Sequence, residues 1–362
     1  MKILHAAETI KGGVATVMRL IASDHVNNPK VSEVYCLVPE NQKDEVKHLP
    51  ASAVLTFERT GRNFSSFVSF ISHFVKNICQ VKPDIIHLHS TFAGVLGRLI
   101  LIVMYPIYRP KVIYCPHAFS FLMEGGQLKK FFYRTVERVL LPITDAVICV
   151  SVYEKNAAIA NGLKEEKLHV VYNGVPAPTS IDSLKNPYQI PGVINLLFVG
   201  RLDYQKGFDI LIKMMSNLDS KPYHLTIIGG AVHGDNLYAE LPQTTYTGWL
   251  SSDEISPYFA YADVLIIPSR WEGFAMVPLE AMSYGTPVIS SNCTSFPEMI
   301  FPGVNGELFD LAHHEKLSSI VVSKTKEEWA TMGKRAESIF LENFKVDKMV
   351  EQTMNVYKHV LK

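Results

Sequence analysis

Two glutamates stand eight positions apart in an apolar part of the chain. Glu272 follows the strand-like run VLIIPS and Trp271, and Glu280 lies in the helix-like run PLEAMSYG. A carboxylate accepts hydrogen bonds from paired hydroxyls, so each side chain suits a ribose or a hexose. The plainer explanation is a surface glutamate at one position and, at Glu280, a glutamate favoured by the positive end of a helix.

Two cations follow another strand-like run. In FVGRLDYQKGFDILIKM the expected strand ends at Gly200, Arg201 comes next, and Lys206 precedes Gly207 and a helix. A guanidinium and an ammonium beside a helix start form a suitable clamp for a diphosphate. Two solvated surface cations are the alternative, but the spacing directly after a strand favours the clamp.

A glycine pair and a histidine occupy two further loops of the same kind. Gly12 and Gly13 lie between the first strand-like run and the helical run VATVMRLIASD, where exposed N–H groups and the helix dipole suit a phosphate. The pattern is neither GxGxxG nor a P-loop, and a glycine turn before a helix is common. His117 ends the run KVIYCPH, and a lone histidine there is more often structural than functional.

No metal or other cofactor is expected. His87 and His89 alternate along one strand-like run and so face one side, but no third ligand follows at a useful spacing. The chain contains no Asp-x-Asp pair, a common device for holding Mg²⁺ on a nucleotide diphosphate. The protein itself must then neutralise a diphosphate, which Arg201, Lys206 and helix N-termini could do.

The elements that position these residues form two series. Strand-like apolar runs alternate with helical patterns from KILHAA to LHVVYNG, and again from INLLFVG to PVISS. Continuous apolar strands of this kind indicate parallel sheets that are covered on both faces. We therefore predict two doubly wound α/β domains, joined by the Pro-, Ser- and Gly-rich stretch 173–192.

Composition supports a globular protein with two unlike halves. Of 362 residues, 48% are hydrophobic and 19% charged. Residues 1–180 hold 20 Lys and Arg against 14 Asp and Glu, a balance of +6, which leaves 15 against 21, or −6, for residues 181–362. A basic first half could face an anionic ligand or lipid headgroups, or its charges could simply be scattered and solvated.

Cellular location is predicted from cysteines and apolar runs. Five dispersed cysteines without a CxxC pair fit reduced thiols in the cytoplasm, and the opening MKILHAAET reads as a first strand, with no signal peptide. The apolar run 99–108 is far shorter than the roughly 20 residues of a spanning helix. Residues 126–142 mix cations with aromatics and could lie on a membrane surface, or could be an ordinary helix covering the sheet. No nucleic-acid partner is expected.

These motifs together resemble a known family. GRLDYQKG followed by EGFAMVPLEAMSYGTPVI is similar to the signature of retaining glycosyltransferases of family 4, which have the GT-B fold. Glu272 and Glu280 match the E-x7-E core, while VYNGV, PHAFSF and DIIHLHS resemble other loops of the family in the right order. The resemblance implies two Rossmann-like domains that face a central cleft.

The resemblance also implies a role for each domain. Residues 190–344 would bind a nucleotide-sugar donor, and residues 1–178 with a final helix at about 345–362 would bind the acceptor. Arg201 and Lys206 would grip the diphosphate and Glu272 the donor sugar. Other matching residues would lie near the sugar and phosphates or bind the ribose, namely Gly273, Phe274, Ala275 and, on the ribose, Glu280.

Two loops of the first domain would complete the site by the same resemblance. Gly12 and Gly13 would close over the diphosphate, and His117 would lie near O6 of the donor sugar or near the acceptor. The loop AVHGDNLYAELPQ, residues 231–243, is shorter than in many members of the family. Contacts to the base, and so its identity, depend on this loop.

The expected function is that of a hexosyltransferase. It would move a sugar, with retention, from a UDP-sugar to a lipid-linked saccharide or sugar acceptor in O-antigen, capsule or other polysaccharide assembly. PHAFSF is similar to members that work at the inner face of the cytoplasmic membrane, so a peripheral membrane contact is expected. A glycosidase would also use two glutamates, but here both belong to one strand–loop–helix unit beside a cationic clamp that hydrolysis of a simple glycoside does not need. The alternatives are a nucleotide-sugar epimerase of the same fold and a non-catalytic nucleotide-sugar-binding protein.

Overall fold

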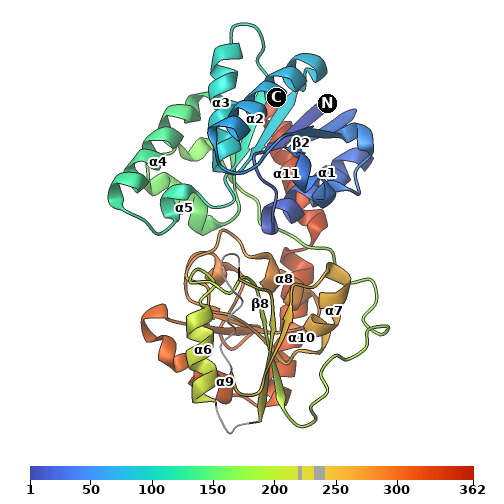
Figure 1. Cartoon of the computed structure of the whole chain (residues 1–362), viewed down its shortest axis with the longest axis vertical. Helices are drawn as coiled ribbons and strands as arrows, with labels where there is room; N and C mark the ends of the chain where they lie inside the picture. Colours follow the sequence, from blue (N-terminus) through green and yellow to red (C-terminus); the bar gives the residue numbers. More distant parts are fainter. Residues whose placement is uncertain (219–221, 232–240) are drawn as a thin grey trace. The chain divides into compact units, whose positions relative to one another are not determined.

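The computed structural model describes residues 1–218, 222–231 and 241–362. Packing divides this chain into two compact units (Figure 1): unit 1 comprises residues 1–173 and 346–362, and unit 2 comprises residues 174–345. Each unit is built on its own parallel sheet, which confirms the predicted pair of doubly wound α/β domains. Most of the loop expected to contact the base lies outside the described residues, because 232–240 are not among them.

Unit 1 has a seven-stranded parallel sheet in the order β3-β2-β1-β4-β5-β6-β7. Its strands are short apolar runs that the helices bury on both faces, as expected for a parallel sheet. The strands are β1 (Lys2–Ala7), β2 (Glu33–Pro39), β3 (Val54–Phe57), β4 (Ile85–His89), β5 (Lys111–Cys115), β6 (Ala146–Cys149) and β7 (Leu168–Val170).

Two helices of unit 1 begin at side-chain caps. Asn63 accepts from Ser66 N at 2.9 Å at the start of one helix, and Ser151 accepts from Glu154 N at 3.0 Å at the start of another. The α-helices are α1 (Gly13–Asn27), α2 (Phe64–Val81), α3 (Thr91–Met104), α4 (Gln127–Leu140), α5 (Val152–Ala160) and α11 (Val346–Leu361). The 3₁₀ helices are η1 (Glu40–Val46), η2 (Ala51–Ala53), η3 (Ser120–Leu122), η4 (Leu141–Ile143) and η5 (Glu165–Lys167).

Alternation along β4 divides its side chains between two faces of the sheet. Ile86 and Leu88 belong to a core that includes side chains from α2 and α3. His87 and His89 point to the opposite face, where α1 and α11 pack against each other. The Tyr357 hydroxyl of α11 lies 2.6 Å from His87 Nδ1, so the last helix of the chain closes this face.

Unit 2 has a six-stranded parallel sheet in the order β10-β9-β8-β11-β12-β13. Its strands are β8 (Ile194–Val199), β9 (Tyr223–Ile228), β10 (Thr244–Gly248), β11 (Val264–Ile267), β12 (Val288–Ser291) and β13 (Gly306–Phe309). Its helices are α6 (Phe208–Asn217), α7 (Ser252–Tyr261), α8 (Met276–Ser283), α9 (Leu317–Val322), α10 (Lys326–Asn343), and the 3₁₀ helices η6 (Phe296–Glu298) and η7 (Leu311–Lys316).

The core of unit 2 gathers large side chains from both layers. Trp329 of α10 and Phe198 of β8 are almost fully buried in it, together with Met214 of α6. Residues 176–193, most of the predicted linker, contain no helix or strand. Across the described part of the chain, no helix is both long and apolar enough to span a bilayer.

Candidate active site

Two loops at one edge of the unit 2 sheet hold most of the predicted donor residues. β8 and β11 are neighbouring parallel strands, so the loops that follow them leave the same edge. These loops are residues 200–207 and 268–275. Gly207 has a φ of 70°, and a Cβ at this position would lie 2.0 Å from the carbonyl oxygen of Pro268. Glycine is therefore required where the two loops pack backbone to backbone.

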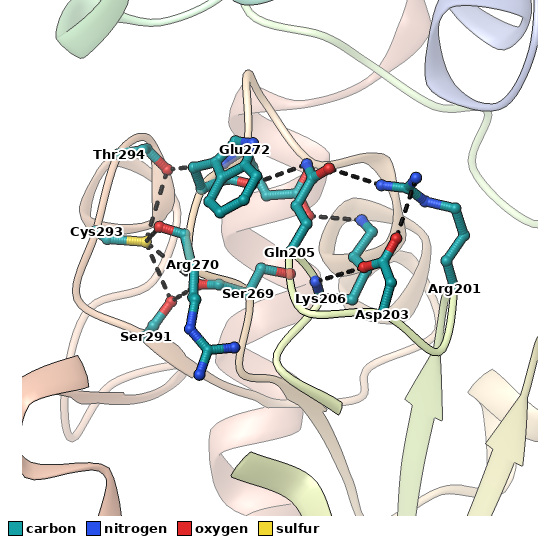
Figure 2. A network of polar contacts seen from close by, with 11 residues as sticks. Arg201, Asp203, Gln205, Lys206, Ser269, Arg270, Glu272, Ser291, Cys293 and Thr294 are labelled. Carbon is teal, nitrogen blue, oxygen red and sulfur yellow. Dashed lines mark hydrogen bonds and ion pairs between the residues drawn. The ribbon is translucent and has the colours of Figure 1, made fainter. Parts of the chain in front are cut away.

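An ion pair joins the two loops directly. The Lys206 ammonium and the Glu272 carboxylate point toward each other (Figure 2), with Lys206 Nζ 2.5 Å from Glu272 Oε1. The side chains are 20% and 11% exposed, so the pair is partly desolvated yet reachable from solvent. An ammonium has three N–H donors and a carboxylate has two oxygens. Lys206 can therefore hold Glu272 while donating to a phosphate oxygen, and Glu272 can still accept from a sugar hydroxyl.

The second predicted cation is held within its own loop. Arg201 Nη2 donates to Gln205 Oε1 at 2.7 Å, and its Nη1 lies 3.1 Å from Asp203 Oδ2. Asp203 Oδ1 in turn accepts from the backbone N–H of Lys206 at 2.9 Å (Figure 2). These bonds orient Arg201 and Lys206 as parts of one loop. A guanidinium has five donors, so Arg201 keeps donors for a further anion.

Side chains that sequence reasoning missed brace the Glu272 loop. Gln205 Nε2 donates to the Trp271 carbonyl oxygen at 3.2 Å, and Thr294 Oγ1 accepts from the Glu272 backbone N–H at 3.3 Å. Cys293 Sγ lies 3.3 Å from the Arg270 carbonyl oxygen. Gln205 lies inside the GRLDYQKG motif and could have been found there. Thr294 carried no signal, because it reaches Glu272 from a different loop.

Arg270, in the second loop, makes contacts that hold the structure of this region together. Its guanidinium makes two parallel bonds to Asp209 on α6, at 2.7 and 2.8 Å, and lies 3.7 Å above the ring of Tyr204. Its Nη1 also donates to the Tyr204 carbonyl oxygen at 2.7 Å. A planar guanidinium satisfied in this way acts as a brace between the first loop and α6.

The remaining donor candidates of unit 2 lie where α8 begins. Gly273, Phe274 and Ala275 lead directly into the helix, and no side-chain hydrogen bond caps its N-terminus. Glu280 lies further along α8 and is half-buried. The structure thus brings Lys206 and Glu272 into contact, puts Arg201 on the same loop as Lys206, and carries Glu280 on the helix that follows Glu272.

The other candidates belong to unit 1. Gly12 has a φ of 59° and caps α1 without a side-chain hydrogen bond, and both Gly12 and Gly13 are exposed. In the described structure, no atom lies within 4 Å of a Cβ built on Gly12. The positive φ, rather than crowding by the protein, therefore favours glycine at this position.

His117 lies on a strained loop that a buried carboxylate holds. His117 and Ala118 have φ angles of 55° and 116°, which residues other than glycine rarely adopt. Glu154 Oε1 accepts from the N–H groups of Ala118 and Phe119, both at 3.0 Å, and its Oε2 accepts from Val150 N at 2.7 Å. Burial raises the pKa of Glu154 to about 7, although these three N–H groups lower it. Sequence reasoning missed Glu154.

His87 and His89 lie in a larger histidine cluster. His5 on β1 is paired in register with His87, and one nitrogen of each of His5, His87 and His89 lies within 4.8 Å of the others. Sequence spacing gave no third ligand beside His87 and His89, but pairing of β1 with β4 supplies His5 from a distant part of the chain. Burial holds the pKa of all three rings well below its usual value.

Comparison with known proteins covers both units. Residues 11–177 match the family described as Glycosyltransferase Family 4, and residues 194–323 match the one described as Glycosyl transferases group 1. An uncharacterized 41.2 kDa protein in the cps region of Klebsiella pneumoniae is 38% identical over 99% of both chains. The O-antigen biosynthesis glycosyltransferase WbnH of Escherichia coli is 33% identical over 58% of this chain and 59% of its own.

Solved structures share the fold of the whole chain. HepE of Anabaena, solved with UDP-glucose, has a TM-score of 0.79 at 21% identity, with 99% of this chain and 100% of that chain covered. Sucrose-phosphate synthase from Thermosynechococcus elongatus has a TM-score of 0.80 at 16% identity, with 100% and 99% covered. One relative matches over 99% of both chains, and each unit matches a glycosyltransferase family model. The chain therefore belongs to the family 4 glycosyltransferases, enzymes of the GT-B fold.

Proposed function

We propose that this glycosyltransferase moves a hexose from a UDP-sugar, with retention, to a saccharide or lipid-linked acceptor in O-antigen or capsule assembly. The observation that carries the proposal is the Lys206–Glu272 pair beside Arg201, where a cation and a carboxylate meet at 2.5 Å. Such a pair suits a ligand that combines phosphates with hydroxyls. The UDP-glucose complex of HepE and the names of the O-antigen and cps-region relatives support the donor and the pathway.

In this proposal the unit 2 loops bind the donor in two parts. Arg201 and Lys206 bind the diphosphate, and Glu272 binds hydroxyls of the sugar, with Gly273, Phe274 and Ala275 beside it. Glu280 binds the ribose from α8. The uncapped N-terminus of this helix adds N–H groups and a positive dipole end near the phosphates.

The same cations stabilise the leaving group. As the bond between the anomeric carbon and the phosphate oxygen breaks, negative charge grows on the departing UDP, where Arg201 and Lys206 bind it best. The acceptor oxygen bonds to the anomeric carbon on the same face, and its proton passes to the leaving phosphate oxygen. Glu272 Oε1 is already paired with Lys206, which disfavours Glu272 as a covalent nucleophile.

Unit 1 carries candidate ligand-binding residues of its own. Gly12 and Gly13 at the start of α1 bind the diphosphate through backbone N–H groups, and His117 meets the donor sugar or the acceptor. The uncapped, exposed helix start and the strained loop at His117 support these assignments. Strained backbone outside glycine is maintained where the surroundings fix it, and it is common at functional sites.

A surface of unit 1 supports a peripheral membrane contact. On α4, Leu128, Phe131, Phe132 and Val139 are 61–83% exposed, at a spacing that puts them on one face of the helix. The cations of α4 are Lys129, Lys130, Arg134 and Arg138, whereas its one carboxylate, Glu137, is buried against Arg98 at 2.8 Å. An exposed apolar stripe flanked by cations suits an anionic membrane surface, where a lipid-linked acceptor resides.

Nucleotide release tests the catalytic proposal. UDP-, GDP- and ADP-sugars are incubated with the full chain, with and without a polyprenyl-diphosphate-linked saccharide in detergent. We expect release of UDP from one donor, faster with acceptor, and loss of release in Glu272→Ala but not in the matched surface variant Lys213→Ala. Donor binding without release under any acceptor would support a binding protein instead, and a covalent glycosyl-enzyme would exclude same-face attack.

Vesicle sedimentation tests the membrane contact separately. We expect the chain to bind phosphatidylglycerol vesicles and not phosphatidylcholine vesicles, with weaker binding at high salt because salt screens the cations. Replacing Phe131 and Phe132 by serine should release the chain. Phe64→Ser on α2, where the ring is even more exposed, serves as the control. Binding that is unchanged by the α4 variant would assign the membrane contact to another surface.

A further inference from the structure

Four histidine rings of unit 1 form a continuous chain of nitrogen-to-nitrogen contacts. His25 Nδ1 lies 3.2 Å from His5 Nε2, and His5 Nδ1 lies 3.0 Å from His89 Nε2. His89 Nδ1 then lies 3.0 Å from His117 Nε2. The rings come from α1, β1, β4 and the loop after β5, so the fold assembles them from distant segments. His117 forms the end of the chain on the strained loop.

Such a chain couples the tautomers of all its members. A neutral imidazole has one N–H donor and one unprotonated acceptor nitrogen. Each contact in the chain needs one donor and one acceptor, so choosing the protonated nitrogen of one ring fixes the next. Only two arrangements satisfy all three contacts: every proton on Nδ1, or every proton on Nε2.

The surroundings keep the rings neutral. His5, His25 and His89 are fully buried, and burial lowers the pKa of His25 and of His117 to about 4. The cavity beside His89 and His117 measures about 10 Å³, the lower limit for a single water. The ring nitrogens therefore depend on one another for hydrogen bonds. A doubly protonated ring inside the chain would put two N–H groups against each other and break the pattern.

The buried end of the chain selects between the two arrangements. His25 Nε2 is buried and has no hydrogen-bond partner among the described residues. A proton on this atom would leave an N–H unpaired in the core, which is rarer than an unused acceptor. With its proton on Nδ1, His25 donates to His5, His5 donates to His89, and His89 donates to His117 Nε2. The proton of His117 must then lie on Nδ1, which points away from His89.

We propose that His25, His5 and His89 are positioning residues that hold His117 neutral with its proton on Nδ1. His117 then donates a hydrogen bond from Nδ1 to a sugar oxygen. In this state His117 cannot serve as a base, because its remaining lone pair accepts from His89. The functional part rests on the proposed placement of His117 beside the donor sugar or acceptor. It implies selection for a ligand with an oxygen at that point over the corresponding deoxy sugar.

The experiment reads the tautomers directly. The full chain is labelled with ¹⁵N-histidine, and two-bond ¹⁵N–¹H correlations are recorded at pH 7 without ligand and assigned with His117→Gln. We expect His117 to be protonated on Nδ1 only. In His5→Phe, which keeps a ring in the core but cuts the chain, His117 should become a mixture of tautomers. In His5→Gln the amide can both donate and accept, so the wild-type tautomer should return.

Activity and controls separate the two parts of the proposal. With the identified donor, His5→Phe should lower kcat severalfold with little change in KM, because only the fraction of His117 protonated on Nδ1 can still donate to the sugar. His169→Phe lies in the same unit but outside the hydrogen-bonded histidines, so it should change neither the His117 tautomer nor kcat. If the tautomers behave as expected but His5→Phe leaves kcat unchanged, the placement of His117 at the sugar is wrong. The chain of histidine hydrogen bonds would still be supported.

Three results would overturn the hydrogen-bond chain itself. These are His117 protonated on Nε2, His117 doubly protonated at pH 7, or a His117 tautomer that is the same in His5→Phe as in the wild type. Stoichiometric Zn²⁺ binding that shifts the nitrogens of His5, His87 and His89 would instead make the cluster a metal site. The wild-type spectrum alone decides the tautomer, so the test survives even if His5→Phe does not fold.

Discussion

The two units present opposite chemistry at their candidate sites. The unit 2 loops use full charges, Lys206 and Glu272, which are partly exposed and paired at 2.5 Å. Unit 1 uses imidazoles that burial keeps uncharged, at distances of 3.0–3.2 Å. A charge survives where water or a charged ligand can solvate it, whereas a buried group without a partner charge is cheaper neutral. The difference is consistent with the proposed donor, whose phosphates are charged and whose sugar is not.

Acid should destabilise unit 1 more than unit 2, and this is the largest difference that we expect between them. His25 and His117 have pKa values of about 4 in the fold and about 6.5 when unfolded, so the unfolded chain binds more protons between these values. The contribution of each ring to the free energy of unfolding is fully present above pH 6.5. It is lost as the pH falls toward 4, and the loss is about 3 kcal/mol for each ring. The pKa of Glu154, raised to about 7, acts with the opposite sign between its unfolded value of 4.5 and 7.

The measurement must follow each unit separately. The three tryptophans, Trp249, Trp271 and Trp329, all lie in unit 2, so their fluorescence reports on that unit. Amide hydrogen exchange between pH 7 and pH 4.5 can follow β1 and β4 of unit 1. We expect protection to fall in unit 1 before the fluorescence changes. Simultaneous loss in both units would contradict a special role for the histidine core.

Removal of Lys206 tests the charged site. We expect Lys206→Ala to lower kcat/KM by about 10²–10³, because one lost donor to a developing anion costs about 3–4 kcal/mol of barrier. Glu272 also loses its partner, so the effect should exceed that of removing a phosphate contact alone. Lys213→Ala, an exposed lysine of the same unit, is the control. Steady-state kinetics with equal losses in both variants would point to general electrostatics instead.

Glu154→Ala tests whether the strained loop of unit 1 needs its carboxylate. The change leaves the N–H groups of Ala118, Phe119 and Val150 without their acceptor, which should cost about 2–3 kcal/mol. Urea unfolding followed by hydrogen exchange in unit 1 measures the loss. Glu154→Gln keeps one acceptor oxygen and should lose less. Equal stability of Glu154→Ala and wild type would show that the loop is held by other contacts.

Arg270→Lys should have the smallest effect. Lysine cannot reproduce the two parallel bonds to Asp209 or the stacking on Tyr204, but both partners reach solvent, so we expect a loss of about 1 kcal/mol. Tryptophan fluorescence in urea measures it in unit 2. An activity loss as large as that of Lys206→Ala would move Arg270 from the brace into the binding site.

The sequence predicted the architecture better than the residues that support the site. Fully buried strands such as β1 and β4 were predicted because continuous apolar runs mark a parallel sheet. β3 and β13 were missed because each lies at the edge of its sheet and at least half of its residues are only half-buried. Short half-buried strands lack a distinctive period.

The positions of candidate residues were predictable where a sequence motif directly follows a strand. Arg201 and Lys206 share the loop after β8, and Glu272 follows the neighbouring strand, so strand order brings them to one edge. His5 and Glu154 were not predicted. Each acts through a segment far along the chain, and strand pairing and loop packing, which bring such segments together, leave no mark in the spacing of residues.

The position of α11 has a consequence for biosynthesis. Unit 1 is built from residues 1–173 and 346–362, and its contact between His87 and Tyr357 spans 270 residues. A ribosome adds about 5–20 residues per second, so synthesis of unit 2 takes many seconds. During this time α11 has not been made, and the face of the unit 1 sheet that carries the histidines is not covered. Unit 2 is continuous and can fold first. The last helix then acts as a closing step, so premature termination before residue 346 would expose the face of unit 1 to aggregation and proteolysis.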